Sequence, residues 1–175
     1  MESLKYVFAY SPPDAVRRSS HADTVTHIAH AHPVVVFARP GCPYCQRALA
    51  RFNRWYAKWF NDVDPKANED FKIRVVDVND HAELKKAHAQ LTGAATVPRI
   101  WVGGRCVGGN SDTEDESSMK TQVSTAIFNA RSRRFNSLVK GYLYPAKNAM
   151  HQLHAADTAP ALQKTFAAKV RMNCK

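Results

Sequence analysis

The chain has 175 residues, of which 45% are hydrophobic and 23% charged, and its formal net charge at pH 7 is +10. This length suits one domain with an appendage, and no apolar stretch approaches the roughly 18 residues of a membrane-spanning helix, which excludes a helical membrane protein. Four cysteines, with no secretory signal recognised at the start, indicate an intracellular reducing compartment, cytoplasmic or mitochondrial.

The first predicted elements are a strand and a helix. Residues 4–10 are mostly apolar and are followed by prolines, so they could form an edge strand. Ser20 precedes an acidic first turn and is typical of a helix N-cap, which predicts a helix over residues 21–31. Two histidines of this helix, His27 and His30, share a face, either as solvated or half-buried side chains or as metal ligands.

A buried strand that delivers two cysteines to a helix is the most informative stretch. The run Val34–Ala38 is short, β-branched and bounded by prolines, which predicts the strand. Pro43 suits the first helical turn, so Cys42 lies near the N-cap, where free N–H groups and the helix dipole favour a thiolate. A thiol in that setting, beside a cation such as Arg39, can have its pKa lowered from about 8.5 to roughly 3.5–7.5. Cys42 is the expected nucleophile, and Cys45, one turn deeper, its disulfide partner.

Two other uses of a Cys-x-x-Cys pair fit the chain less well. Half of a zinc site requires a second Cys/His pair at ligand spacing, which Cys106 and Cys174 do not supply, so we predict no metal site. A structural disulfide is typical of secreted proteins, and we expect no secretion. The pattern therefore indicates a redox-active dithiol.

The helix after the motif is amphipathic and is followed by a second strand and helix. Its outer face is basic, which indicates a solvated stripe or, alternatively, a surface that attracts acidic partners. The stripe consists of Arg47, Arg51, Arg54 and Lys58. Alternation over residues 71–78 predicts a strand, and a helix then follows up to Gly93. This order predicts a parallel βαβ crossover.

A hairpin and a last core helix complete the predicted domain. Two short strands join at Gly103-Gly104, and Pro98 stands at the beginning of the first, where a cis bond is a deliberate feature. Ser111 with Glu114 forms a predicted capping box, and the helix that follows is expected to reach Ala130.

The motifs in this order resemble those of a dithiol glutaredoxin: Cys42-Pro43-Tyr44-Cys45, Thr96-Val97-Pro98, Gly108-Gly109 and Ser111-Asp112-Thr113. The resemblance covers residues 21–130 and implies an α/β, thioredoxin-like fold with a central mixed four-stranded sheet flanked by helices. Residues 1–20 are then an N-terminal extension, and residues 131–175 a basic, partly helical C-terminal extension.

The resemblance also implies roles for single residues. Cys42 is the attacking thiolate and Cys45 the resolving thiol, with glutathione as co-substrate and no metal cofactor. The residues expected to bind glutathione are Arg39, Tyr44, Thr96, Val97, Pro98, Gly109, Asp112 and Thr113. The backbone of Val97 would pair with the cysteinyl part of glutathione, while Asp112 and Thr113 at a helix N-terminus would hold its γ-glutamyl end.

Two positions bear on how far the resemblance extends. The family often has Gln or Arg just before the Thr-Val-Pro motif, where this chain has Ala94-Ala95, so one contact to the glycine carboxylate is expected to be lost. Some relatives bridge an iron–sulfur cluster between protomers, whereas Pro43 is typical of those that do not.

The positive charge is concentrated at the C-terminal end. Residues 131–175 carry nine Lys/Arg and one acidic residue, Asp157, for a net +8, whereas residues 1–130 carry only +2. Apolar residues over 161–170 predict a short amphipathic helix. We expect this segment to be dispensable for chemistry and to bind a protein assembly rather than nucleic acid.

Two functions follow from the whole sequence. The first is an enzyme, a glutathione-dependent thiol–disulfide oxidoreductase that reduces protein disulfides or protein–glutathione mixed disulfides. The alternative is a glutaredoxin-derived structural subunit of a large assembly, for example a mitochondrial one, held by its basic tail.

Overall fold

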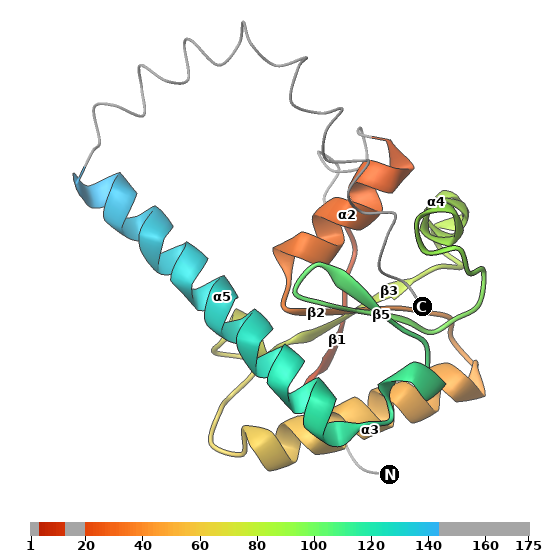
Figure 1. Ribbon diagram of the computed structural model, residues 1–175, viewed down its shortest axis with the longest axis horizontal. Coiled ribbons are helices and arrows are strands. Elements are labelled where there is room, and N and C mark those ends of the chain that lie inside the picture. The colour runs from red at the N-terminus through yellow and green to blue at the C-terminus, as the bar shows by residue number, and fades with distance from the viewer. Residues whose placement is uncertain (1–3, 13–19, 144–175) are drawn as a thin grey trace, which may run out of the picture.

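The computed structural model describes residues 4–12 and 20–143. A five-stranded sheet in the order β1-β3-β2-β4-β5 forms its centre (Figure 1). The strands are β1 (Val7–Ala9), β2 (Val34–Ala38), β3 (Ile73–Asp77), β4 (Arg99–Val102) and β5 (Arg105–Gly108). Both β1 and β2 run parallel to β3, whereas β4 is antiparallel to β2 and to β5. The predicted parallel crossover from β2 to β3 is therefore confirmed.

The predicted thioredoxin-like fold is confirmed, but the strand count of four is corrected to five. The additional strand is β1, which lies within the predicted N-terminal extension. Tyr6, next to β1, is fully buried, and its hydroxyl donates a hydrogen bond to the carbonyl oxygen of Phe60 at 2.7 Å. Its N–H donates to Oδ1 of Asn53 at 3.0 Å. Part of residues 1–20 therefore belongs to the sheet and its core.

The helices cover both faces of the sheet. They are α2 (His21–Ala31), α3 (Pro43–Trp59), α4 (Ala82–Thr92) and α5 (Glu116–Leu143), with short 3-10 turns η1 (Glu69–Phe71) and η2 (Ser111–Thr113). Along β2, Val34 and Val36 pack against α3 and α5, whereas Val35 and Phe37 pack against α2 and α4 (Figure 1). Because β2 is covered on both faces, all five of its residues are apolar and buried.

The start of α5 differs from the prediction. Residues 111–113 form only the single turn η2, and α5 begins at Glu116. The carboxylate of Asp115 accepts hydrogen bonds from the N–H groups of Ser117 and Ser118 at 3.0 and 3.2 Å. The predicted capping box of Ser111 with Glu114 is therefore wrong, because the first turn of the long helix is capped by Asp115 instead.

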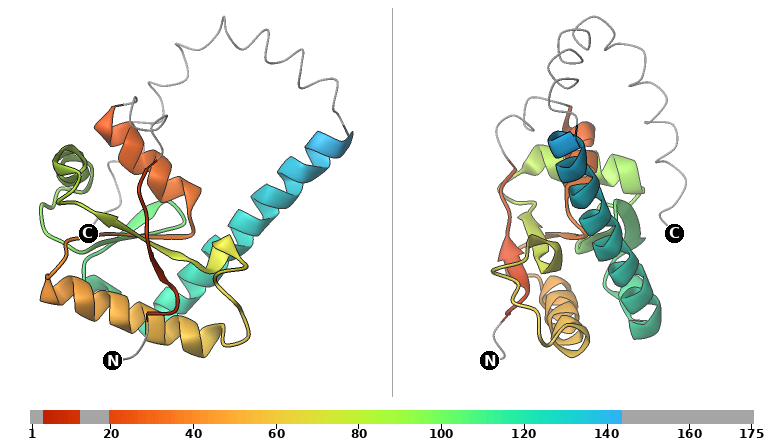
Figure 2. Two further views of the ribbon diagram at one scale, coloured as in Figure 1. Left: turned by 180° about the vertical axis from the view of Figure 1, so that it is seen from behind. Right: turned by 90° about the vertical axis from the view of Figure 1, so that its left-hand side faces the viewer.

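The end of α5 also differs, because the helix does not stop at Ala130 but continues to Leu143 beyond the edge of the sheet (Figure 2). The predicted helix within residues 161–170 lies outside the described residues, and the division at residue 130 stays a prediction. None of the described helices combines the length and the apolar composition that crossing a bilayer requires.

Candidate functional site

A tight turn between β2 and α3 places Cys42 at the end of a helix. Gly41 has a φ of 73°, a left-handed conformation that favours glycine. Cys42 then adopts an extended conformation as the N-cap of α3, and Pro43 opens the helix. The N–H of Cys42 donates to the carbonyl oxygen of Arg39 at 3.3 Å, which closes the turn. The predicted position of Cys42 at the N-cap is confirmed.

The two thiols of the motif are free, and their pKa values move in opposite directions. Burial acts to raise the pKa of Cys42, but hydrogen bonds from Cys45 and from the Tyr44 backbone, together with the charge of Arg39, outweigh it and lower that pKa. Burial, followed by the hydrogen bond and charge of Cys42, raises the pKa of Cys45 to about 11. Cys42 therefore loses its proton before Cys45 does.

Two adjoining hollows form a groove beside Cys42. The first has a volume of about 240 Å³ and is lined by residues that include Arg39, Cys42, Tyr44, Lys85, Thr96 and Val97. The second has a volume of about 290 Å³ and is lined by residues that include Tyr44, Val97, Pro98, Arg99, Gly109 and Asp112. Because Tyr44, Thr96 and Val97 line both hollows, the groove is continuous. It brings together every predicted site residue except Cys45 and Thr113.

The middle of the groove is formed by the chain that enters β4. The peptide bond between Val97 and Pro98 is cis, as the sequence predicted. Val97 is only half-buried, and the hydroxyl of Thr96 accepts a hydrogen bond from Nη2 of Arg99 at 3.0 Å. The segment therefore lines the groove next to the thiol.

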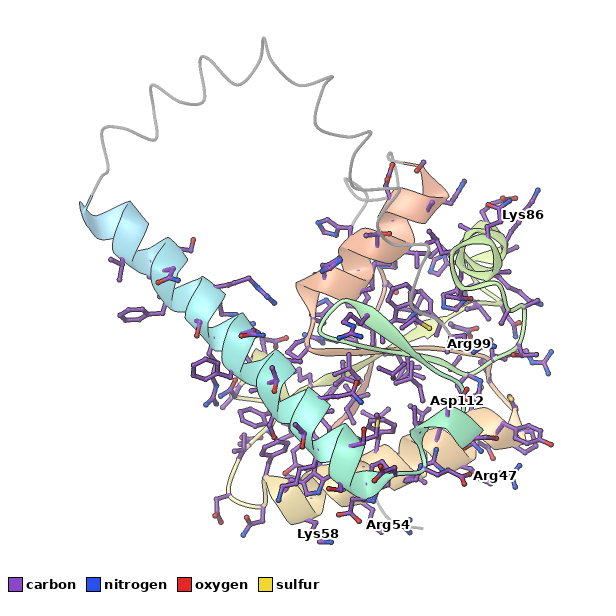
Figure 3. All side chains as sticks on the ribbon, viewed as in Figure 1. Arg47, Arg54, Lys58, Lys86, Arg99 and Asp112 are labelled. Atoms are coloured by element: carbon purple, nitrogen blue, oxygen red, sulfur yellow. The ribbon has the colours of Figure 1, made fainter. Side chains whose placement is uncertain are left out.

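The far end of the groove is formed by the residues that follow β5, from Gly109 to Asp112 in η2. The carboxylate of Asp112 accepts a hydrogen bond from the N–H of Gly109 at 2.8 Å, and Figure 3 shows this side chain with Arg99 at the same end of the molecule. A Cβ atom on Gly108 would lie 2.5 Å from Cβ of Asp112, and the φ of Gly108 is 110°. Gly108 is therefore required because any side chain there would displace the Asp112 carboxylate from the N–H of Gly109.

Thr113 does not line the groove with its side chain. It is fully buried, and its hydroxyl donates toward the carbonyl oxygen of Gly109 at 3.0 Å. The predicted helix N-terminus at Asp112 and Thr113 is the single turn η2, so no long helix dipole points into the groove. The expectation that the side chain of Thr113 contacts a ligand is corrected by this inward orientation.

Lys85 is a functional candidate that the sequence analysis did not single out. It lies on α4 and lines the same hollow as Arg39 and Cys42, while its neighbour Leu84 is buried. Lys85 thus supplies a cation near Ala95, where one contact to the glycine carboxylate was expected to be lost. Because Leu84 is buried, Lys85 lies at the edge of the buried face of α4. Only the packing of α4 against the sheet determines which edge of that face lies near the thiol.

Within residues 4–12 and 20–143, no group of three or more His, Cys, Asp or Glu side chains has a metal-binding arrangement, and this includes His27 and His30. A separate hollow of about 280 Å³ lies between the N-terminal ends of α2 and α4, and it is lined by neither cysteine of the motif. The candidate functional site is therefore the dithiol of Cys42 and Cys45 together with the groove beside Cys42.

Comparison with known proteins gives a consistent result. The family model described as Glutaredoxin matches residues 34–107. A glutaredoxin of Vibrio cholerae is 39% identical over 85 residues, which cover 46% of this chain and 85% of that protein. Glutaredoxin-C8 of rice, Oryza sativa, is 32% identical over 95 residues, which cover 54% of this chain and 63% of the relative.

Solved structures with a similar arrangement include the complex of a buckwheat glutaredoxin with glutathione. It is 18% identical in sequence, with a TM-score of 0.48, and the match covers 69% of this chain and 96% of that one. The family-model match includes both motif cysteines, whereas the matched part of the rice protein is less than two thirds of its length.

Proposed function

Because the chain belongs to the glutaredoxin family, we propose that it is a glutathione-dependent thiol–disulfide oxidoreductase that reduces protein disulfides or protein–glutathione mixed disulfides. The observation that carries this proposal is the opposite displacement of two pKa values within one helical turn. The pKa of Cys42 is lowered, mainly because hydrogen bonds and Arg39 outweigh burial, and that of Cys45 is raised to about 11. Such a pair supplies one nucleophilic thiolate and one resolving thiol that stays protonated.

The first chemical step is attack by the Cys42 thiolate on the glutathione sulfur of a mixed disulfide. A bond forms between the sulfur of Cys42 and that of glutathione, the protein–glutathione bond breaks, and the released protein thiolate takes a proton from water. Glutathione thiolate then attacks the glutathione sulfur bound to Cys42. This second exchange releases glutathione disulfide and restores the Cys42 thiolate, so two electrons pass from glutathione to the substrate.

Reduction of a protein disulfide uses Cys45 as well. Attack by Cys42 first joins its sulfur to one substrate sulfur and releases the other as a thiolate. Cys45, whose pKa is raised to about 11, then gives its proton to that leaving thiolate, and its own thiolate attacks the sulfur of Cys42. A bond forms between the sulfurs of Cys42 and Cys45, the bond between Cys42 and the substrate breaks, and the released substrate thiolate takes a proton from water. The substrate leaves fully reduced, and two glutathione molecules afterwards reduce the disulfide between Cys42 and Cys45.

The groove is proposed to hold glutathione along its length. Arg39 and Lys85 supply positive charge for the glycine carboxylate, and the backbone of Val97 lies beside the thiol, where the cysteinyl part must be. Asp112, at the far end, supplies a carboxylate for the ammonium of the γ-glutamyl group, beside a ring face from Tyr44. In this arrangement the sulfur of glutathione is directed toward Cys42.

We also propose a compartment for the protein and a partner for its C-terminal segment. The presence of only four cysteines, two of them in the redox motif, supports work in an intracellular reducing compartment, either cytoplasmic or mitochondrial. The positive charge of residues 131–175 supports attachment to an acidic protein assembly, although residues 144–175 lie outside the described part of the chain. The purely structural alternative is not favoured, because both thiols and the groove beside them are present.

The test compares Cys42→Ser and Cys45→Ser in two assays with glutathione as reductant. Cys42→Ser should abolish reduction of both a glutathionylated peptide and a protein disulfide. Cys45→Ser should preserve deglutathionylation, because that reaction needs only one protein thiol, and should impair disulfide reduction. Equal loss of both activities in the two variants would contradict the assigned roles.

A further inference from the structure

Arg51 on α3 was expected to belong to the solvated basic stripe, but the structure turns its side chain inward. The side chain is only 15% exposed, whereas Arg47, Arg54 and Lys58 are exposed on the same helix (Figure 3). Its guanidinium reaches the β5–α5 loop, residues 109–115, which includes η2 and lies far from Arg51 in sequence. Arg51 therefore contacts the protein interior, whereas the three other basic residues face solvent.

The guanidinium of Arg51 contacts three residues of that loop, which are Asn110, Thr113 and Glu114. Nη2 donates to the carbonyl oxygen of Asn110 at 2.6 Å and to Oγ1 of Thr113 at 3.1 Å. Nη1 lies 3.6 Å from Oε1 of Glu114, and the guanidinium carbon lies 5.6 Å from the centre of the Trp55 ring. A planar fork supported by an aromatic ring reaches several acceptors at once, which a lysine ammonium does not.

The same loop carries the far end of the groove on its other side. Asp112 and Gly109 line the second hollow, and the carboxylate of Asp112 accepts a hydrogen bond from the N–H of Gly109. Thr113, which accepts from Arg51, also donates toward the carbonyl of Gly109 at 3.0 Å. Arg51 therefore ties the loop to α3, the helix that begins at Cys42, without lining either hollow.

We propose that Arg51 is a positioning residue that sets the affinity of the groove for the γ-glutamyl end of glutathione, by fixing the loop that carries Asp112 relative to Cys42. The inference rests on the proposed function. Because Arg51 lines neither hollow of the groove, its loss weakens recognition of glutathione only through the loop and leaves the reactivity of Cys42 unchanged. It acts through Asn110 and Thr113.

The experiment is a single-turnover reaction of the pre-reduced full-length protein with two forms of one peptide. One form carries glutathione on its cysteine and the other carries a single cysteine, which lacks the γ-glutamyl group. In Arg51→Met, the half-saturating concentration of the glutathionylated peptide should rise about 10-fold, the scale of one lost charged hydrogen bond. The limiting rate, the reaction with the cysteinylated peptide and the pH profile of Cys42 alkylation should not change.

Two further variants complete the design. Arg51→Lys keeps the charge and the stem, so it should fold and should show a smaller increase, because it reaches fewer acceptors. Arg54→Met removes an exposed arginine from the same helix and should match the wild type. An unchanged half-saturating concentration in both Arg51 variants, or an equal loss with both peptides, overturns the inference.

The outcome for the wild type separates this inference from the proposed function. A wild type that prefers the glutathionylated peptide, combined with variants that keep that preference, rejects the role of Arg51 alone. A wild type with no such preference rejects the proposed use of glutathione and with it this inference. Hydrogen exchange at residues 109–114 then measures separately whether Arg51 orders the loop.

Discussion

The carboxylate of Asp70 lies 3.3 Å from Nη2 of Arg134, although the sequence analysis assigned these residues to different segments. Asp70 belongs to η1, and its side chain is 5% exposed. Nε of Arg131 lies 3.9 Å from the same carboxylate, and its guanidinium carbon lies 4.7 Å from the centre of the Phe71 ring. Since a buried carboxylate without cationic partners is costly, this part of α5 stabilises the domain.

This contact predicts that the position of a C-terminal truncation matters. A chain that ends at residue 130 loses both arginines and should be about 1–3 kcal/mol less stable, since the arginines are half-exposed and their charge is partly screened. A chain that ends at residue 143 should keep the stability of the full-length protein. Urea denaturation measures both, and Arg131→Met with Arg134→Met should reproduce the loss while Arg105→Met should not.

Equal urea midpoints for the two truncated chains would contradict this account. The segment after residue 130 would then contribute nothing to the stability of the domain.

Gly108 leaves room for the side chain of Asp112. In Gly108→Ala, the new Cβ meets Asp112 at 2.5 Å, so the carboxylate must leave the N–H of Gly109. Turnover of a glutathionylated peptide should fall about 10-fold, as in Asp112→Ala, because a charged contact to the γ-glutamyl ammonium is lost. Steady-state kinetics at limiting substrate give this value.

Gly93→Ala is the control for backbone strain. Gly93 also has a positive φ, of 71°, but a Cβ there meets nothing within 4 Å. It should reduce stability while preserving turnover by the folded protein. If Gly93→Ala and Gly108→Ala lower turnover equally, the effect comes from general destabilisation and not from Asp112.

Lys85 and its neighbour Lys86 provide a matched pair on α4. Only Lys85 lines the hollow next to Cys42, whereas Lys86 is exposed on the helix (Figure 3). Lys85→Met should raise the KM for a glutathionylated peptide about 3-fold to 10-fold, because one solvent-accessible cation for a carboxylate is removed. Lys86→Met should leave the KM unchanged, and high salt should reduce the difference between the variants. A similar KM for both variants would place the carboxylate elsewhere.

The parts of the site that could be predicted from sequence depend on local structure. The apolar run of β2, the proline after Cys42 and the glycines of the hairpin turn each specify the backbone around them. For this reason the N-cap position of Cys42, the cis bond before Pro98 and the turn at Gly103-Gly104 all agree with the prediction.

The parts that were missed depend on contacts between distant segments. The edge strand predicted over residues 4–10 is present as β1, but its pairing with β3 was missed because no local pattern determines that partner. Arg51 has the helical spacing of the exposed stripe, but the loop after β5 draws its side chain inward. Ser111 and Asp115 both fit the pattern of a cap, and the path of the chain after Gly109 selects Asp115.

The most direct test of the account measures the alkylation rate of each thiol as a function of pH. The reduced full-length protein is treated with iodoacetamide, the peptides containing Cys42 and Cys45 are quantified by mass spectrometry, and free cysteine is measured in the same buffers. We expect the rate for Cys42 to reach half its maximum at a lower pH than free cysteine, and the rate for Cys45 to rise only toward a pH of about 11. Alkylation of Cys45 before Cys42, or of both thiols with the profile of free cysteine, would contradict the assignment of Cys42 as the nucleophile.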